Sequence, residues 1–90
     1  MEGLIEGQIV HYVLPDGASK GEHRPAVIVK VWDAHRAQGT VNMLVFTDCL
    51  NDVSPSDPQT ASYGSGVVWA TSIRYSEDKE PRTWHWIEKA

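Results

Sequence analysis

The cation best placed for chemistry in this sequence is Arg24, which directly precedes Pro25. A residue before proline is held in an extended conformation, so the main chain at Arg24 is fixed. The planar guanidinium presents a fork of donors suited to a phosphate or a carboxylate. His23 lies beside it, and an imidazole can exchange protons near neutral pH. We therefore predict that His23 and Arg24 bind an anionic ligand.

Thr47 and Asp48 form the second pair of candidate ligand-binding residues. Thr47 ends an apolar run and supplies a hydroxyl, and Asp48 can accept a hydrogen bond from a ribose or a base edge. A structural role for Arg24 is the alternative, in which it pairs with Glu22 or Asp48 and clamps a loop. Such ion pairs are common and individually weak.

Two of the four tryptophans, Trp84 and Trp86, alternate along one short segment. On a strand, this spacing puts both indoles on one face, where they could stack on a base. Large aromatic side chains also fill the core of a small domain or a subunit interface. Both interpretations of the pair remain open, whereas Trp32 and Trp69 are expected in the core or an interface.

The other reactive side chains predict no metal site and no cofactor. The chain has one cysteine, Cys49, with no cationic neighbour in sequence to lower its pKa. The spacing of the histidines matches no metal-binding motif, and exposure to solvent is the default expectation for all of them: His11, His23, His35 and His85.

The elements that must position these residues follow a period of two. Apolar and β-branched runs predict five strands, at residues 7–13, 26–32, 40–46, 67–73 and 83–87, and one helical turn at residues 33–38. Five short strands favour a closed or nearly closed barrel, which leaves no exposed edges. Residues 54–66 form one long polar loop. The predicted fold is therefore mainly β, a small five-stranded barrel.

Length and charge narrow the function classes. The 90 residues make one domain, 1–90, and eight basic residues against twelve acidic ones give a net charge of −4. The basic residues are scattered singly, which argues against duplex DNA as a partner. No apolar run approaches the ~20 residues that span a membrane, and the acidic start of the chain is unlike an export signal. We expect a cytoplasmic protein without a membrane partner.

The stretch from Gly7 to Asp48 resembles the core of MazF/PemK-type toxins, which are small SH3-like barrels. The resemblance rests on Gly7-Gln-Ile-Val, on the Pro15–Glu22 loop, on His23-Arg24-Pro25-Ala26-Val27-Ile28, and on a Gly39-opened strand followed by Thr47. It implies that Arg24 and Thr47 are the catalytic residues of a metal-independent endoribonuclease that cleaves single-stranded RNA. The second half resembles short proteins of tailed phages and prophages. This resemblance suggests where the protein originates rather than what it does, and a phage-encoded protein would act in the host cytoplasm.

Three functions follow from these observations. We favour a non-enzymatic phage-type protein that sequesters a small anionic nucleotide-like ligand, as a sponge against host immune signalling. Its ligand-binding residues are Arg24, His23, Thr47, Asp48, Trp84 and Trp86. The first alternative is the MazF-like sequence-selective endoribonuclease, and the second is a structural phage accessory protein. Because so small a domain gains from hiding aromatic surface between subunits, a homodimer or higher oligomer is expected.

Overall fold

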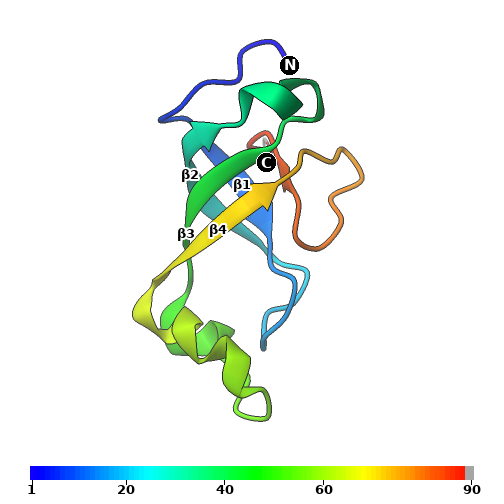
Figure 1. The fold of residues 1–90 in the computed structure, drawn as a ribbon. Coiled ribbons are helices and arrows are strands. Elements are labelled where there is room, and N and C mark those ends of the chain that lie inside the picture. Colours follow the sequence, from blue (N-terminus) through cyan, green and yellow to red (C-terminus); the bar gives the residue numbers. More distant parts are fainter. Residues whose placement is uncertain (89–90) are drawn as a thin grey trace.

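Antiparallel pairing organises the computed structural model, which describes residues 1–88 (Figure 1). One sheet contains all five strands, in the order β4-β3-β2-β1-β5. The strands are β1 (Ile9–Val13), β2 (His23–Val31), β3 (Val41–Phe46), β4 (Val67–Ile73) and β5 (Trp84–His85), and three 3₁₀ helices connect them: η1 (Asp33–Gln38), η2 (Cys49–Asp52) and η3 (Pro58–Ser65).

The strand predictions are largely confirmed. β4 has the predicted bounds, and η1 is the predicted helical turn at residues 33–38. β2 begins three residues earlier than expected, at His23, because the chain from His23 to Val27 pairs with β1. β5 is shorter than expected and contains Trp84 and His85 alone.

The sheet is not closed into a barrel, so that part of the fold prediction is wrong. Closure requires the two outermost strands, β4 and β5, to pair along their length. With two residues, β5 is too short to do so, and it pairs with β1. A single bridge between Tyr75 and Trp84 joins the chain after β4 to β5.

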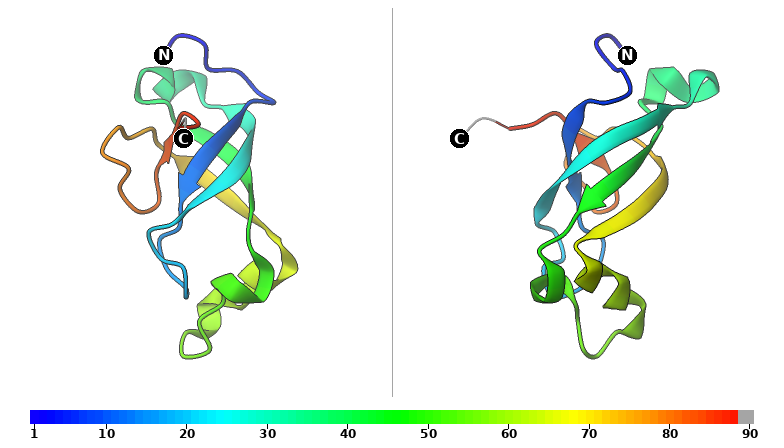
Figure 2. Two further views of the ribbon diagram at one scale, coloured as in Figure 1. Left: turned by 180° about the vertical axis from the view of Figure 1, so that it is seen from behind. Right: turned by 90° about the vertical axis from the view of Figure 1, so that its left-hand side faces the viewer.

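The segment predicted as one long loop, residues 54–66, contains regular structure. It contains η3, which begins after Asp57 with Pro58 at its first position. The Asp57 side chain accepts a hydrogen bond from the main-chain N–H of Gln59 at 3.1 Å, as an N-terminal capping residue does. Figure 2 shows η2 and η3 together at one end of the sheet and η1 at the other.

One face of the sheet carries the core. Alternate residues of β1, β2 and β3 point inward and are buried, including Val10, Ala26, Ile28, Met43 and Val45. Val68 and Ala70 of β4 are half-buried against them. Trp84 fills the centre of this cluster, fully buried, and its indole N–H donates to the carbonyl of Gly39 at 2.6 Å. Tyr75 and Trp86 pack edge-on against it, with ring centroids 5.0 Å away in each case. Among residues 1–88, no helix has the length and apolar character needed to cross a membrane.

Candidate metal centre

Three histidines from three different strands meet on the face of the sheet opposite the core. His11 of β1 lies directly opposite His85 of β5 in the strand register. His23 begins β2 opposite Val13, two residues along β1 from His11. The ring centroids of His23 and His85 are 4.6 Å apart, and His11 lies 5.8 Å from His85 and 6.3 Å from His23. The position of β1 between β2 and β5 thus brings the imidazoles together.

Glu88 places one carboxylate oxygen among the three rings. Its Oε1 lies 2.5 Å from Nδ1 of His23, 2.6 Å from Nε2 of His85 and 3.7 Å from Nδ1 of His11. Lys79 donates from Nζ to the other oxygen, Oε2, at 2.8 Å. One atom from each histidine and one from Glu88 all lie within 4.8 Å of one another. Three ring nitrogens therefore converge on a single point that an acidic oxygen now occupies.

The pKa values of two members of the cluster, His85 and Glu88, are shifted in the direction that a metal ligand needs. Burial lowers the pKa of His85, which is 3% exposed, and so favours its neutral imidazole form. Hydrogen bonds from Lys79, and then from His85 and His23, hold the pKa of Glu88 well below its usual range. A neutral imidazole and an ionised carboxylate are the forms that coordinate a metal ion.

The cluster also contains unsatisfied ring nitrogens. Nδ1 of His11 and Nδ1 of His85 are buried and have no hydrogen-bond partner among the described residues. Buried polar atoms are normally paired, so each such atom needs an explanation. The 3.7 Å between His11 Nδ1 and Glu88 Oε1 is too long for a hydrogen bond. A cation at the point of convergence would give His11 a partner.

The donor set of three imidazole nitrogens and one carboxylate oxygen suits a zinc-like ion. Zn²⁺ binds histidine nitrogen and carboxylate oxygen at about 2.0–2.2 Å in four-coordinate tetrahedral sites. Ligand atoms of such a tetrahedral site lie about 3.3–3.6 Å from one another. Oε1 of Glu88 is only 2.5 and 2.6 Å from nitrogens of His23 and His85, so Glu88 must move outward to admit the ion. Lys79 would keep its hydrogen bond to the outer oxygen of Glu88, and such bonds commonly orient metal ligands.

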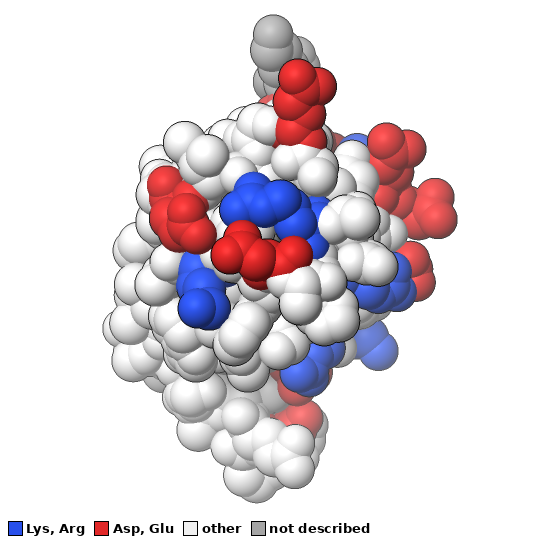
Figure 3. Space-filling view, turned by 45° about the horizontal axis from the view of Figure 1, so that its top comes forward, with Lys and Arg blue, Asp and Glu red and all other residues white. Residues whose placement is uncertain are grey.

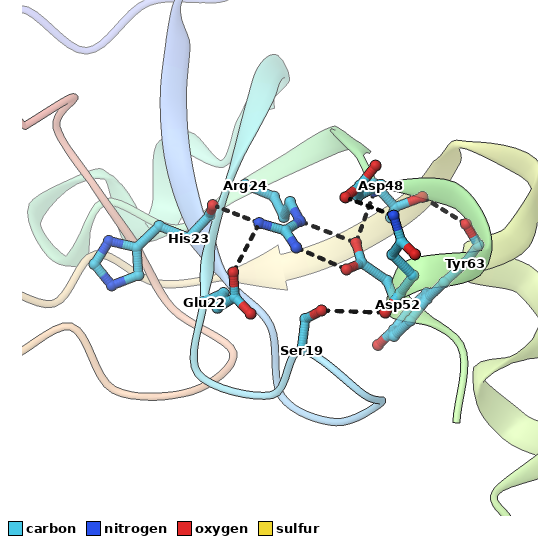
Figure 4. A network of polar contacts seen from close by, with 9 residues as sticks. Ser19, Glu22, His23, Arg24, Asp48, Asp52 and Tyr63 are labelled. Carbon is cyan, nitrogen blue, oxygen red and sulfur yellow. Dashed lines mark hydrogen bonds and ion pairs between the residues drawn. The ribbon is translucent and has the colours of Figure 1, made fainter. Parts of the chain in front are cut away.

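Arg24 lies on the other side of β2 from His23 and forms a two-pronged ion pair with Asp52 (Figure 4). Nε and Nη2 of Arg24 lie 2.9 and 2.7 Å from the two carboxylate oxygens. Asp52 is fully buried and also accepts the main-chain N–H of Asp48 at 2.7 Å. The carbonyl of His23 accepts a further bond from Arg24, and Glu22 lies 3.6 Å away. The guanidinium fork thus holds an internal carboxylate, and its principal partner is Asp52 rather than Glu22 or Asp48.

The remaining predicted site residues are spread over different surroundings. Thr47 donates its hydroxyl to the carbonyl of Tyr63 at 2.5 Å, and Asp48 accepts a bond from Asn51 at 3.1 Å. Trp84 is fully buried, which favours the core alternative for it, and Trp86 is half-buried against Trp84. The structure therefore links Arg24 to Asp48 through Asp52 and to the main chain of His23 directly. It places Trp84 in the core and Trp86 against it.

Sequence reasoning missed the histidine cluster. The expectation that the histidines face solvent is wrong for His85, and no metal site was expected from their spacing. The available signal was that His11 and His85 each neighbour a buried aromatic residue, Tyr12 and Trp84, which puts both histidines on the opposite face of their strands. Pairing of those strands was needed to complete the inference.

Comparison with known proteins gives no match: no family model fits the chain, and neither a curated protein nor a solved structure is significantly similar to it. The resemblances to MazF/PemK toxins and to phage proteins remain predictions.

Removal of Arg24 should destabilise the fold. Arg24→Ala leaves the carboxylate of Asp52 buried and unpaired, and breaking a buried ion pair in this way costs about 3–5 kcal/mol. Arg36→Ala is the matched control, because its pair with Asp33 is exposed and such pairs contribute about 0–1 kcal/mol. Urea unfolding measures both variants. Equal, small losses of unfolding free energy for the two variants would contradict the structural role of the Arg24–Asp52 pair.

The same pair should make stability depend on acid pH. Hydrogen bonding from Arg24 holds the pKa of Asp52 well below its usual range. The ionised carboxylate therefore contributes stability above about pH 4, the ordinary aspartate value, and this contribution is lost as the pH falls further. The gap in unfolding free energy between wild type and Asp52→Asn should be constant near neutrality and shrink in acid. A gap that widens in acid would contradict the lowered pKa of Asp52.

Proposed function

We propose that this protein binds one divalent transition-metal ion of the zinc class through His11, His23, His85 and Glu88. The observation that carries the proposal is the convergence of three ring nitrogens, from three strands, on one carboxylate oxygen. The neutral form of His85 and the ionised form of Glu88 favour coordination.

The number of donors favours holding the ion over catalysis. Zinc sites that stabilise or store the metal have four protein ligands, whereas catalytic sites have three and leave one position to water or substrate. Here the chain itself supplies four donors. Three of them lie on the sheet, and Glu88 lies beyond β5, held by Lys79. Metal binding would therefore tie the chain after β5 to β1 and β2.

Titration calorimetry with Zn²⁺ tests the site. We expect one ion per chain, and at least ~100-fold weaker binding for His11→Gln and for Glu88→Gln, each of which removes a ligand (about 2.7 kcal/mol). Lys79→Ala, which removes the hydrogen bond that orients Glu88, should weaken binding about 10-fold. Zn²⁺ should also raise the melting temperature of the wild-type protein, because an ion that binds the folded state alone stabilises it.

His35→Gln is the matched control, since His35 is exposed on η1 and lies outside the cluster. It should bind Zn²⁺ as the wild type does. Binding that no cluster variant weakens, or that His35→Gln weakens as much as His11→Gln, would contradict the proposal. Circular dichroism of each variant in the metal-free state separates loss of a ligand from loss of the fold.

A second candidate function is the binding of a small anionic, nucleotide-like ligand, for which the observation is a cleft of about 270 Å³. Its walls include the rings of Tyr12 and Tyr63 and the exposed side chain of Arg82. The two tyrosines are themselves buried and Asp16 also lines the cleft, so the support for an anionic ligand is the guanidinium of Arg82, which can hold a phosphate. This cleft, rather than Arg24 with Asp52 in its fork, is where the geometry supports such a ligand.

Charge over the surface is consistent with a local site of this kind rather than a nucleic-acid groove. In Figure 3, basic and acidic side chains are interspersed on the face shown. The MazF-like ribonuclease remains a prediction, and it requires Arg24 to leave Asp52 and Thr47 to leave the Tyr63 carbonyl. A role as a structural phage accessory protein likewise remains a prediction.

Nucleoside monophosphates are suitable probes for the cleft. If it binds them, Arg82→Ala should weaken the affinity roughly 10- to 150-fold, by loss of charge-assisted hydrogen bonds worth ~1.5–3 kcal/mol. Arg74→Ala is the control, because Arg74 is also exposed but lies by Glu80 and does not line the cleft. Equal affinity of wild type and Arg82→Ala for the nucleotides would contradict this candidate function. In a separate assay, cleavage of added single-stranded RNA would favour the ribonuclease.

A further inference from the structure

The outward face of the sheet is apolar across four strands. Strand register places Ile9 opposite Val27, Val27 opposite Leu44, and Leu44 opposite Trp69, which makes a continuous row from β1 to β4. In the next row, Phe46 of β3 lies opposite Val67 of β4, and on the same face Pro25 of β2 lies opposite His11 of β1.

These side chains are open to solvent. Ile9 and Trp69 are each 56% exposed, and Phe46 and Val67 are each 40% exposed. An antiparallel sheet with one free face normally alternates apolar residues inward with polar residues outward. Here β2, β3 and β4 carry apolar residues on both faces, the pattern of a sheet that is covered on both sides. We name the outward residues Ile9, Pro25, Val27, Leu44, Phe46, Val67 and Trp69 the outer apolar face.

We propose that the outer apolar face is the interface of a homodimer, in which two copies of this chain pack sheet against sheet. Contiguous exposed apolar surface on a small protein marks a contact site. A symmetric interface uses the same patch on both copies, so the patch must be complementary to itself. A sheet face of exposed aliphatic and aromatic side chains can meet this requirement, and paired sheets pack about 10 Å apart.

Charge favours a second copy as the occupant. Each chain has a net charge of −4, so two copies repel one another wherever acidic surfaces meet. Apart from His11, which lies opposite Pro25 at the border with the histidine cluster, the rows of the outer apolar face contain no acidic or basic residue. Lys30, at the end of the face, folds its Nζ over the ring of Trp32 at 4.8 Å from the centroid. A charged partner would find no counter-charge here, whereas an identical uncharged face can approach without opposing like charges.

The size of the face indicates the strength of the dimer. Four strands spaced about 4.8 Å apart, each contributing roughly five residues, give a face on the order of 19 by 17 Å. Two such faces would bury roughly 650 Å² in total, which is less than the about 1,000 Å² of stable interfaces and is typical of weak, transient ones. We therefore expect reversible association with a dissociation constant in the micromolar range.

Analytical ultracentrifugation, in EDTA to exclude bridging by metal ions, tests the proposal. From about 1 to about 500 µM protein, the mass should rise from the 10.0 kDa monomer to twice that value. Trp69→Glu should weaken association at least about 10-fold, because each copy buries an unpaired charge, and Val67→Glu should act in the same direction. Leu50→Glu is the control, since Leu50 is 78% exposed on η2, outside the sheet.

A monomer at every concentration would overturn the proposal. It would also be overturned if Leu50→Glu weakened association as much as Trp69→Glu did. Circular dichroism identifies any variant that fails to fold. The result is independent of Zn²⁺ affinity, so failure of the metal site leaves this test unaffected.

Discussion

The pairing of β1 with two neighbours is the constraint on which the rest of the structure depends. β1 lies between β2 and β5, and each pairing fixes which residues meet across the sheet. Because side chains alternate between the two faces, a slip of one residue would send His11 into the core and Tyr12 to the surface. The same register that buries Tyr12 and Trp84 therefore assembles His11, His23 and His85 on the opposite face. Core packing holds the candidate metal site in place.

The ion pair of Arg24 with Asp52 performs a comparable task on the other face of β2. It joins the start of β2 to η2, and through Asp52 it fixes the main chain at Asp48. A buried pair of this kind is costly to break although its net contribution is small, because each partner left alone would be an uncompensated charge. Arg24 and His23 are neighbours in sequence but face opposite sides of the sheet, so the clamp and the histidine cluster are separate units that share one strand.

Much of the sheet could be predicted from the sequence, because alternation of apolar residues is a local property. The apolar alternation predicts all five strands, and the segment between the second and third strands predicts the turn of η1. The Asp57-Pro58 pair is a usable signal for the start of η3. Closure was not predictable in this way, because it depends on how many residues of β5 pair and with which strand. The metal cluster was out of reach for the same reason. His11, His23 and His85 are distant in sequence, and no spacing rule describes residues that meet through strand register. Arg24 was correctly singled out, yet its partner Asp52 depends on where η2 folds.

The central claim is that His11, His23, His85 and Glu88 coordinate one metal ion. X-ray absorption spectroscopy at the zinc edge, on the protein loaded with one Zn²⁺ per chain, tests it most directly. The account predicts a first shell of nitrogen and oxygen atoms at about 2.0–2.2 Å, with outer-shell scattering from three imidazole rings. A first shell that contains sulfur from Cys49, or one of oxygen atoms without imidazole scattering, would contradict it.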